Sequence, residues 1–250
     1  MEPLLRLSLR QLASRSRLLL ILLLAALPVA LTALISNVEG KFSNSEFINH
    51  ILDGLLIAGI LPIVTMVLAT SAFGNEMEDR TLSYLVLKPV RRWLIVLPKL
   101  LASIIVGGLV LIASGVIATR LGASSIVGAT VLVLDGSLQA ALAVGVALFA
   151  GVVTYTAIFT WAGLVSTRAI AFALIYVFLW EGLISTFFGG VRYLSVRGYT
   201  LAILHGMDDE TFAPLKDRVI EFPAALVGAA VITTVFFWLT VRHLRRMDVP

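Results

Sequence analysis

Long apolar runs without a charged residue constrain this chain more than any other feature. No charge falls between Arg17 and Glu39, and none falls between Asp135 and Arg168. About 20 consecutive apolar residues cross the hydrocarbon core of a bilayer as an α-helix. The apolar residues come in unbroken runs rather than with a 3.6 or 2 residue period, so most of their surface faces lipid. We therefore predict an all-α polytopic membrane protein, with residues 1–250 forming a single transmembrane domain.

The gaps between charged residues predict six transmembrane helices. The segment Leu121–Leu134 is too short for a seventh, and we place it outside as an extension or a partly embedded segment. Glu181 interrupts the fifth span. The predicted spans are about Leu18–Ser36, Gly54–Phe73, Leu94–Thr119, Ser137–Val165, Ala169–Phe188 and Phe222–Val241.

The distribution of Lys and Arg predicts the orientation of these spans. An even number of spans puts both termini on one side, and that side carries 13 of the 19 basic residues. Basic residues accumulate on the cytoplasmic side of a membrane protein. Both termini and the loop 74–92 are therefore expected in the cytoplasm.

The first 17 residues form a basic amphipathic segment. Arg6, Arg10 and Arg17 share one helical stripe, with Leu5 and Leu9 beside them. This pattern predicts a helix over 1–17 that lies in the cytoplasmic interface, with its arginines toward anionic lipid. A signal peptide is the alternative, which we reject because the following apolar run is long enough to span.

The largest predicted extracytoplasmic segment is 189–221. Glycines and Pro214 divide it into pieces too short for a separate domain. The stretches "YTLAIL" and "DETFAPLKDRVI" are expected to form short helices on the outer mouth of the bundle.

The sequence carries no motif of a catalytic or nucleotide-binding site. His50, His205 and His243 are far apart, and neither HExxH, GxSxG, a Walker A loop nor GxGxxG occurs. We therefore expect no catalytic residue, no metal site and no cofactor in this chain, and no nucleic-acid partner.

Glu181 is the one ionisable residue deep in a predicted span. A carboxylate in hydrocarbon is costly, so it is a functional candidate when it faces the protein interior or water. The alternative, that the span ends early and Glu181 lies near the outer surface, stays open. With Thr154, Tyr155 and Thr160 it forms our set of possible pathway residues. An intramembrane enzyme built around Glu181 is a further hypothesis.

The segment between the second and third spans is more strongly charged than a simple connector requires. Glu76, Glu78 and Asp79 come first, an apolar helical face follows, and Pro89 ends the helix. As an interfacial connector its bases would bind lipid phosphates, but those phosphates would repel the leading acids. The order of charges therefore indicates a protein partner.

This segment also carries a family resemblance. The pattern "E-x-E-D-R-T-L-x-Y-L-x-x-K-P-V-x-R" from Glu76 to Arg92, followed by Lys99, resembles the permease subunits of type-2 ATP-binding-cassette exporters, in particular the compact NosY-like group. Six spans, the basic N-terminal helix and the outer segment after the fifth span agree with it. Some relatives have Gly where Arg80 stands, which puts individual contacts in doubt.

The resemblance implies a permease that couples ATP hydrolysis to export of a substrate across the inner membrane of a prokaryote. A separate ATPase subunit, in two copies, would hold the ATP and Mg²⁺, and a second permease copy would complete a homodimer. The implied alternative is an ATPase-driven component that regulates or recruits an extracytoplasmic partner. By carry-over, loop 74–92 is a coupling helix. Its ATPase contacts are Glu76, Glu78, Asp79, Arg80, Thr81 and Tyr84, with Arg91, Arg92 and Lys99 at the membrane edge.

Overall fold

The computed structural model describes residues 2–12, 14–37, 43–78, 92–127, 134–166, 168–184 and 193–246. All regular structure in these ranges is helical, as the apolar runs predict. The elements are α1 (Glu2–Leu12), α2 (Arg15–Asn37), α3 (Asn44–Glu46), the π-helix η1 (Phe47–Ile60), α4 (Leu61–Glu78), α6 (Trp93–Val127), α7 (Leu134–Val165), α8 (Ala169–Ile175), the π-helix η2 (Tyr176–Ile184), α10 (Val196–Met207), the 3₁₀ helix η4 (Ala213–Arg218) and α11 (Phe222–Arg246).

Five helices in the described residues are long and apolar enough to cross a membrane. They are Arg15–Ile35, Asn44–Phe73, Trp93–Leu121, Leu138–Val165 and Phe222–Arg246. These correspond to five of the six predicted spans, which confirms a multi-pass membrane protein. The fifth predicted span coincides with a shorter apolar helix, Ala169–Gly182, so the count of six stays a prediction.

The second span begins earlier than the sequence analysis placed it. We took Asp53 as its boundary, whereas the helix runs without a break from Asn44 through η1 and α4. Its start is fixed by a capping box, in which the Ser43 hydroxyl accepts from the Glu46 amide and the Glu46 carboxylate accepts from the Ser43 amide. Asp53 lies inside the helix because its charge is paired within the protein, as described below.

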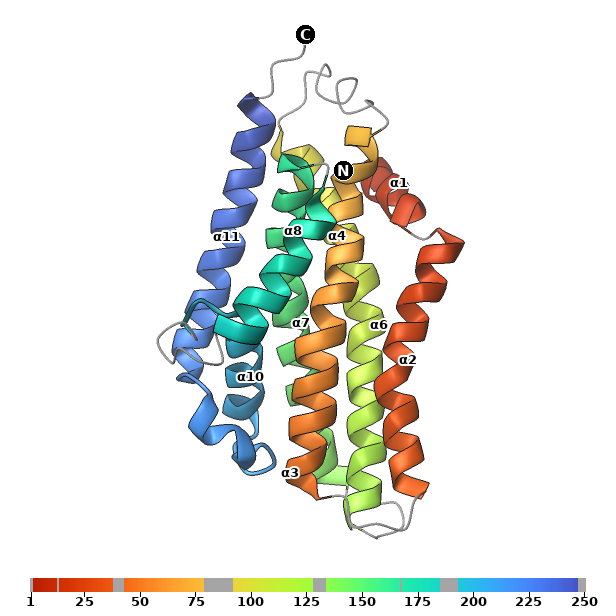
Figure 1. The fold of residues 1–250 in the computed structure, drawn as a ribbon, viewed down its shortest axis with the longest axis vertical. Coiled ribbons are helices and arrows are strands. Elements are labelled where there is room, and N and C mark those ends of the chain that lie inside the picture. The colour runs from red at the N-terminus through yellow and green to blue at the C-terminus, as the bar shows by residue number, and fades with distance from the viewer. Residues whose placement is uncertain are drawn as a thin grey trace.

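The helices form an elongated bundle with α7 at its centre (Figure 1). α7 packs against α4, α6, α10 and α11. Of the most apolar stretch of α7, 67% is buried inside the protein, whereas the corresponding share is 22% for α2 and for α11, which lie at the two edges. Leucines on α2, such as Leu19 and Leu23, are exposed on the outside of this bundle.

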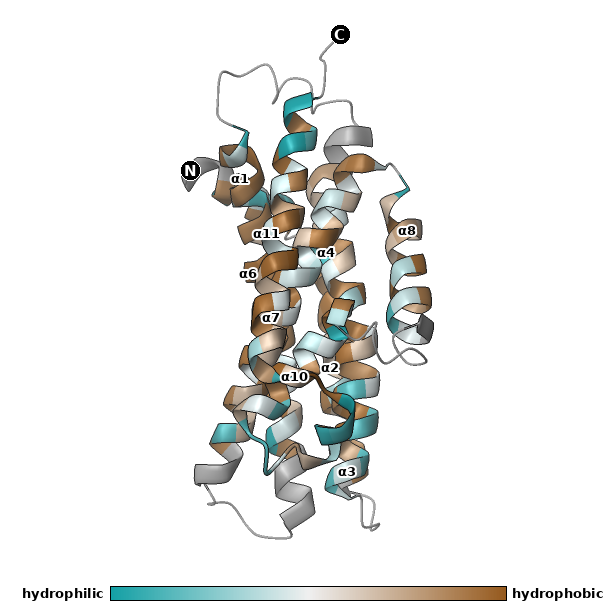
Figure 2. Ribbon diagram, turned by 90° about the vertical axis from the view of Figure 1, so that its left-hand side faces the viewer, coloured by the Kyte–Doolittle hydropathy of each residue, from teal (hydrophilic) through white to brown (hydrophobic). Residues whose placement is uncertain are grey.

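The two ends of the bundle differ. α1, the end of α4, the start of α6 and the last turn of α11 lie at one end, which we call the termini end (Figure 1). α3 and the turn between α10 and α11 lie at the other, the far end. α8 and η2 descend from the termini end and stop part-way along the bundle. In the perpendicular view α8 lies at the edge of the bundle (Figure 2), where it contacts α7 and α4.

α4 and α7 approach most closely at one glycine. A Cβ atom built on Gly163 would lie 2.8 Å from the carbonyl oxygen of Thr70. Only a residue without a side chain allows the two backbones this contact. Gly163 therefore fixes how closely the second and fourth spans pack near the termini end.

α1 and the segment after η2 fold as short helices. Leu12 is buried and Leu5 and Leu9 are partly buried, while Arg6 and Arg10 are exposed. This agrees with the predicted amphipathic stripe, although the helix ends at Leu12 and its place in the membrane interface stays a prediction. The predicted helices at "YTLAIL" and "DETFAPLKDRVI" correspond to α10 and η4.

Candidate functional site

The predicted ATPase-contact segment starts from the termini end of α4. Glu76 and Glu78 belong to the last turns of α4, which ends at Glu78. Asp79, Arg80, Thr81, Tyr84 and Arg91 lie outside the described residues. Arg92 immediately precedes α6, and its carbonyl oxygen accepts from the amides of Ile95 and Val96 at 3.0 and 3.2 Å. The described part of the segment is thus joined rigidly to two long helices.

Lys99 is buried among the helices, a contact that the sequence analysis does not predict, and its place at the membrane edge stays a prediction. It belongs to the second turn of α6 and is only 5% exposed. Its ammonium donates to the carbonyl oxygen of Ala72 and lies 4.6 Å from the centre of the Phe73 ring. Hydrogen bonding and a cation–π contact are what a buried ammonium requires. Lys99 therefore connects the second turn of α6 to the last part of α4, which ends at Glu78.

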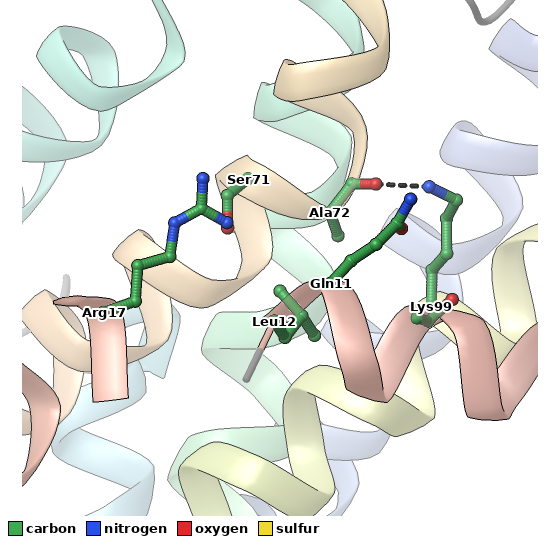
Figure 3. Close-up of a pocket in the computed structure, with 7 residues that line it drawn as sticks. Gln11, Leu12, Arg17, Ser71, Ala72 and Lys99 are labelled. Atoms are coloured by element: carbon green, nitrogen blue, oxygen red, sulfur yellow. Dashed lines mark hydrogen bonds between the residues drawn. The ribbon is translucent and has the colours of Figure 1, made fainter. Parts of the chain in front are cut away.

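A small polar pocket beside Lys99 joins four helices at this point (Figure 3). Lys99 of α6 and Gln11 of α1 reach into the same space, next to Ser71 and Ala72 of α4 and Arg17 of α2. Its volume of about 10 Å³ is close to the minimum for one water molecule. The four helices α1, α2, α4 and α6 therefore meet at this pocket, close to where α4 ends.

A second polar site surrounds Glu181, deeper in the bundle. Glu181 is 2% exposed, which favours the interior reading over the surface one. Its carboxylate accepts from the Ser195 hydroxyl at 2.5 Å and from the Val196 amide at 2.8 Å. The Tyr176 hydroxyl donates to it at 3.2 Å. Because Ser195 is the N-cap of α10, the carboxylate stands at the positive end of the α10 dipole.

The next residue of α10 carries an ion pair to the second span. Arg197 donates from Nε to Oδ1 of Asp53 at 2.8 Å and from Nη2 to Oδ2 at 2.9 Å. A guanidinium stays protonated in proteins, so Arg197 carries its charge in this pair. We call Asp53, Glu181, Ser195 and Arg197 the α10 clasp.

Sequence reasoning found only Glu181 of this clasp. Asp53 was taken as a span boundary, and Arg197 and Ser195 were assigned to an outer loop. One available signal was the "SNSE" capping box at Ser43–Glu46, which starts the helix upstream of Asp53. The pairing of Asp53 with Arg197, 144 residues apart, has no local signal.

The other predicted pathway residues are buried on α7. Tyr155 stacks on Phe159 at 5.5 Å, and Phe159 meets Tyr176 edge-on at 6.2 Å, which connects Tyr155 to the clasp. Thr154 faces α11, because its hydroxyl accepts from Thr233 at 3.4 Å. The Thr160 hydroxyl is buried and has no hydrogen-bond partner among the described residues. The structure thus groups Tyr155 with Glu181 but not with Thr154 and Thr160.

Comparison with known families decides the class of this protein. A family model described as ABC-2 family transporter protein matches residues 13–180. The chain belongs to the ABC-2 transporter family. It is accordingly a membrane-spanning permease of an ABC transporter, and the family implies an ABC ATPase as its partner. The match includes the contact segment and ends just before Glu181. A search of curated proteins gives no significant match.

Proposed function

We propose that this permease couples ATP hydrolysis by a separate ATPase subunit to export of a substrate across the inner membrane of a prokaryote, with both termini in the cytoplasm. The observation that carries the proposal is the acidic start of the contact segment. Glu76 and Glu78 end α4 at the same end of the bundle as both termini and the basic ends of α1 and α11. Basic residues mark the cytoplasmic side, where ATP is present.

The continuous helix of the second span supplies a mechanical route from the ATPase to the clasp. η1 and α4 together run from Phe47 to Glu78, so one rod joins the proposed docking acids to Asp53. In the proposal, two ATPase subunits close on ATP and Mg²⁺ and push the docked segment. The rod then shifts Asp53 against Arg197, which moves α10 relative to the bundle. This is a two-state movement biased by a ligand on the partner, and the permease supplies no chemistry.

A second permease copy would complete the pathway as a homodimer. α8 and η2 support this, because they expose Ile175 and Phe178 at 58 and 68%. The pathway residues Thr154, Tyr155, Thr160 and Glu181 are closed inside one copy. Their role therefore requires a conformation in which α10 has moved.

The alternative function, regulation or recruitment of an extracytoplasmic partner, has one observation in its favour. Asp209, Glu210, Lys216, Asp217 and Arg218 form an exposed charged surface at the far end. Against this, α10 itself is buried from Val196 to Leu204 except at Arg197 and Gly198. A helix buried in this way favours a role for α10 as a moving part of the bundle over a role in binding an external partner. Charge reversal at Lys216 and Arg218 separates the two, since it should disrupt recruitment and leave flux intact.

The test of the main proposal uses the permease purified with its ATPase. Reversing the charges of Glu76, Glu78 and Asp79 to Lys should abolish stimulated ATP turnover, because the docking contact loses its acids. The control reverses Asp209 and Glu210, two exposed acids at the far end. The triple variant must still be found in the membrane fraction, and size-exclusion chromatography of the purified protein must show that it stays folded. Unchanged turnover in that folded variant contradicts the docking role.

A further inference from the structure

An aromatic groove opens on the side of the bundle between α8 and α11. Its volume is about 390 Å³, within the range of about 300–1,000 Å³ that small-molecule sites occupy. Residues of α7 form its floor, residues of α8 and η2 form one wall, and residues of α11 form the other. The lining residues of these helices are Ile158, Phe159, Trp161 and Ala162 (floor), Phe172, Ala173, Tyr176 and Trp180 (first wall), and Ile232 and Phe236 (second wall). The groove is distinct from the α10 clasp, although Tyr176 lines the groove and donates a hydrogen bond to Glu181 of the clasp.

Two polar side chains of the lining, Tyr176 and Trp180, already make hydrogen bonds within the protein. The Tyr176 hydroxyl donates to Glu181, and the Trp180 indole donates to the carbonyl oxygen of Leu194 at 3.3 Å. The Trp161 ring packs edge-on against Phe236 with 5.5 Å between centroids. The groove therefore offers an occupant mostly carbon surface. Phe172 at its edge is 60% exposed, so the opening faces the hydrocarbon of the bilayer, and an alkyl chain fits it best.

Basic residues stand above both walls of this groove. Arg168 is exposed and precedes α8 by one residue, four positions from Phe172 and hence about 6 Å along the axis. His243 follows Phe236 by seven residues and Ile232 by eleven, which places it on the groove face of α11 about 10 Å further along. Arg246 follows Ile232 by fourteen residues on the same stripe and is exposed. All three lie at the termini end.

We propose that the groove binds an acyl chain of an anionic phospholipid whose phosphate lies against Arg168, His243 and Arg246. The bound lipid joins α8 to α11 across the face of α7, where the protein itself leaves them apart (Figure 2). A second copy of the chain is a poorer occupant. Two copies in one membrane run parallel, so a two-fold contact centred on the groove brings the two basic rims together. The proposal concerns lipid binding and does not depend on transport.

Intrinsic fluorescence provides a direct readout. Trp161 and Trp180 line the groove, and the only other tryptophans are Trp93 and Trp238. In a full-length Trp93→Phe, Trp238→Phe background in detergent, phosphatidylglycerol brominated in mid-chain is titrated and quenching is recorded. Phosphatidylcholine with the same brominated chains is the neutral probe. We expect quenching by phosphatidylglycerol at several-fold lower concentration, with a preference that declines as salt is raised.

Matched variants separate the specific site from bulk lipid. Arg246→Gln should weaken phosphatidylglycerol binding about fivefold, since a basic residue at the headgroup contributes about 1 kcal/mol. Arg245→Gln removes an exposed charge from the opposite side of α11 and should leave it unchanged. Ala162→Phe, which fills the floor, should reduce quenching by both lipids. Equal quenching by both lipids with no effect of Arg246→Gln overturns the proposal in favour of bulk lipid. Shielding of the tryptophans in a dimer until it dissociates overturns it in favour of a second copy.

Discussion

The ion pair between Asp53 and Arg197 is a long-range contact on which the position of α10 depends. Both oxygens of Asp53 are engaged by one guanidinium, a bidentate geometry that is stronger and more specific than a single bond. Asp53 is 3% exposed, so its charge has little access to water. Such a pair adds little net stability over apolar residues, but removal of one partner leaves a buried charge uncompensated.

Asp53→Asn should therefore lower the stability of the purified permease by about 3 kcal/mol. The amide is nearly isosteric, so the loss reflects charge rather than shape. Thermal unfolding followed by size-exclusion chromatography measures it. The double exchange Asp53→Arg, Arg197→Asp restores an ion pair of reversed direction and should recover part of the loss. If the double exchange loses more stability than the two single changes added together, Asp53 and Arg197 do not stabilise the protein as an ion pair.

Lys99 has a different role, because its ammonium joins two helices, α6 and α4. Lys99→Met keeps the apolar stem but removes the bond to the Ala72 carbonyl and the contact with the Phe73 ring. We expect a loss of stability of about 1–2 kcal/mol and a larger relative loss of transport-linked ATP turnover, since α4 and α6 no longer move together. Lys216→Met, at an exposed lysine of the far end, is the control. Turnover that declines only in proportion to the amount of folded protein argues against a coupling role.

At the scale of the elements, each of the two π-helices carries one buried carboxylate. η1 carries Asp53 and η2 carries Glu181, and both carboxylates meet the first residues of α10. π-Helices are rare and concentrate at functional positions. Their wider turn changes which residues face inward. Here it directs two acids from different spans to one helix start, consistent with α10 as the element that moves.

The α4–α7 contact gives a sharp test of packing along one helix. Gly163→Ala places a methyl group 2.8 Å from the Thr70 carbonyl oxygen, so the two backbones must separate. We expect a loss of about 1–3 kcal/mol. Gly145→Ala on the same helix meets the Ile112 side chain at 3.6 Å, an ordinary contact. It should be neutral or stabilise by up to about 1 kcal/mol, because Ala is the better helix former. Melting temperatures of both variants, measured in parallel, decide the case; equal shifts contradict the close approach at Gly163.

The elements were predictable to different degrees for physical reasons. Five spans followed from apolar length alone, because a bilayer requires about 20 apolar residues whatever their order. The predicted start of the second span was wrong. A charged residue such as Asp53 indicates the end of a span unless a partner inside the protein pairs with it, and the sequence does not reveal that Arg197 is this partner. Burial of Lys99 was missed for the same reason. Contacts between distant residues, such as Asp53 with Arg197, depend on tertiary packing that leaves no local pattern.

For the whole molecule, the distribution of basic residues agrees with the position of the two described ends of the chain. The termini end carries the basic residues of α1 and of the last turn of α11. α8 and η2 stop part-way, and α10 continues toward the far end before α11 returns (Figure 1). The described ends of the chain, α1 and the last turn of α11, lie at the termini end, and five described helices are long enough to span.

Cysteine labelling tests the predicted orientation without interference, because the chain contains no cysteine. Asp217→Cys at the far end and Arg245→Cys at the termini end replace exposed residues of the described structure, so neither change should disturb packing. In intact inner-membrane spheroplasts, a membrane-impermeant maleimide should label Asp217→Cys and leave Arg245→Cys unlabelled. Disruption of the membrane should make both react, which serves as the accessibility control. The reverse pattern in intact cells would put the contact segment on the side without ATP, and the proposed coupling to a cytoplasmic ATPase would then be impossible.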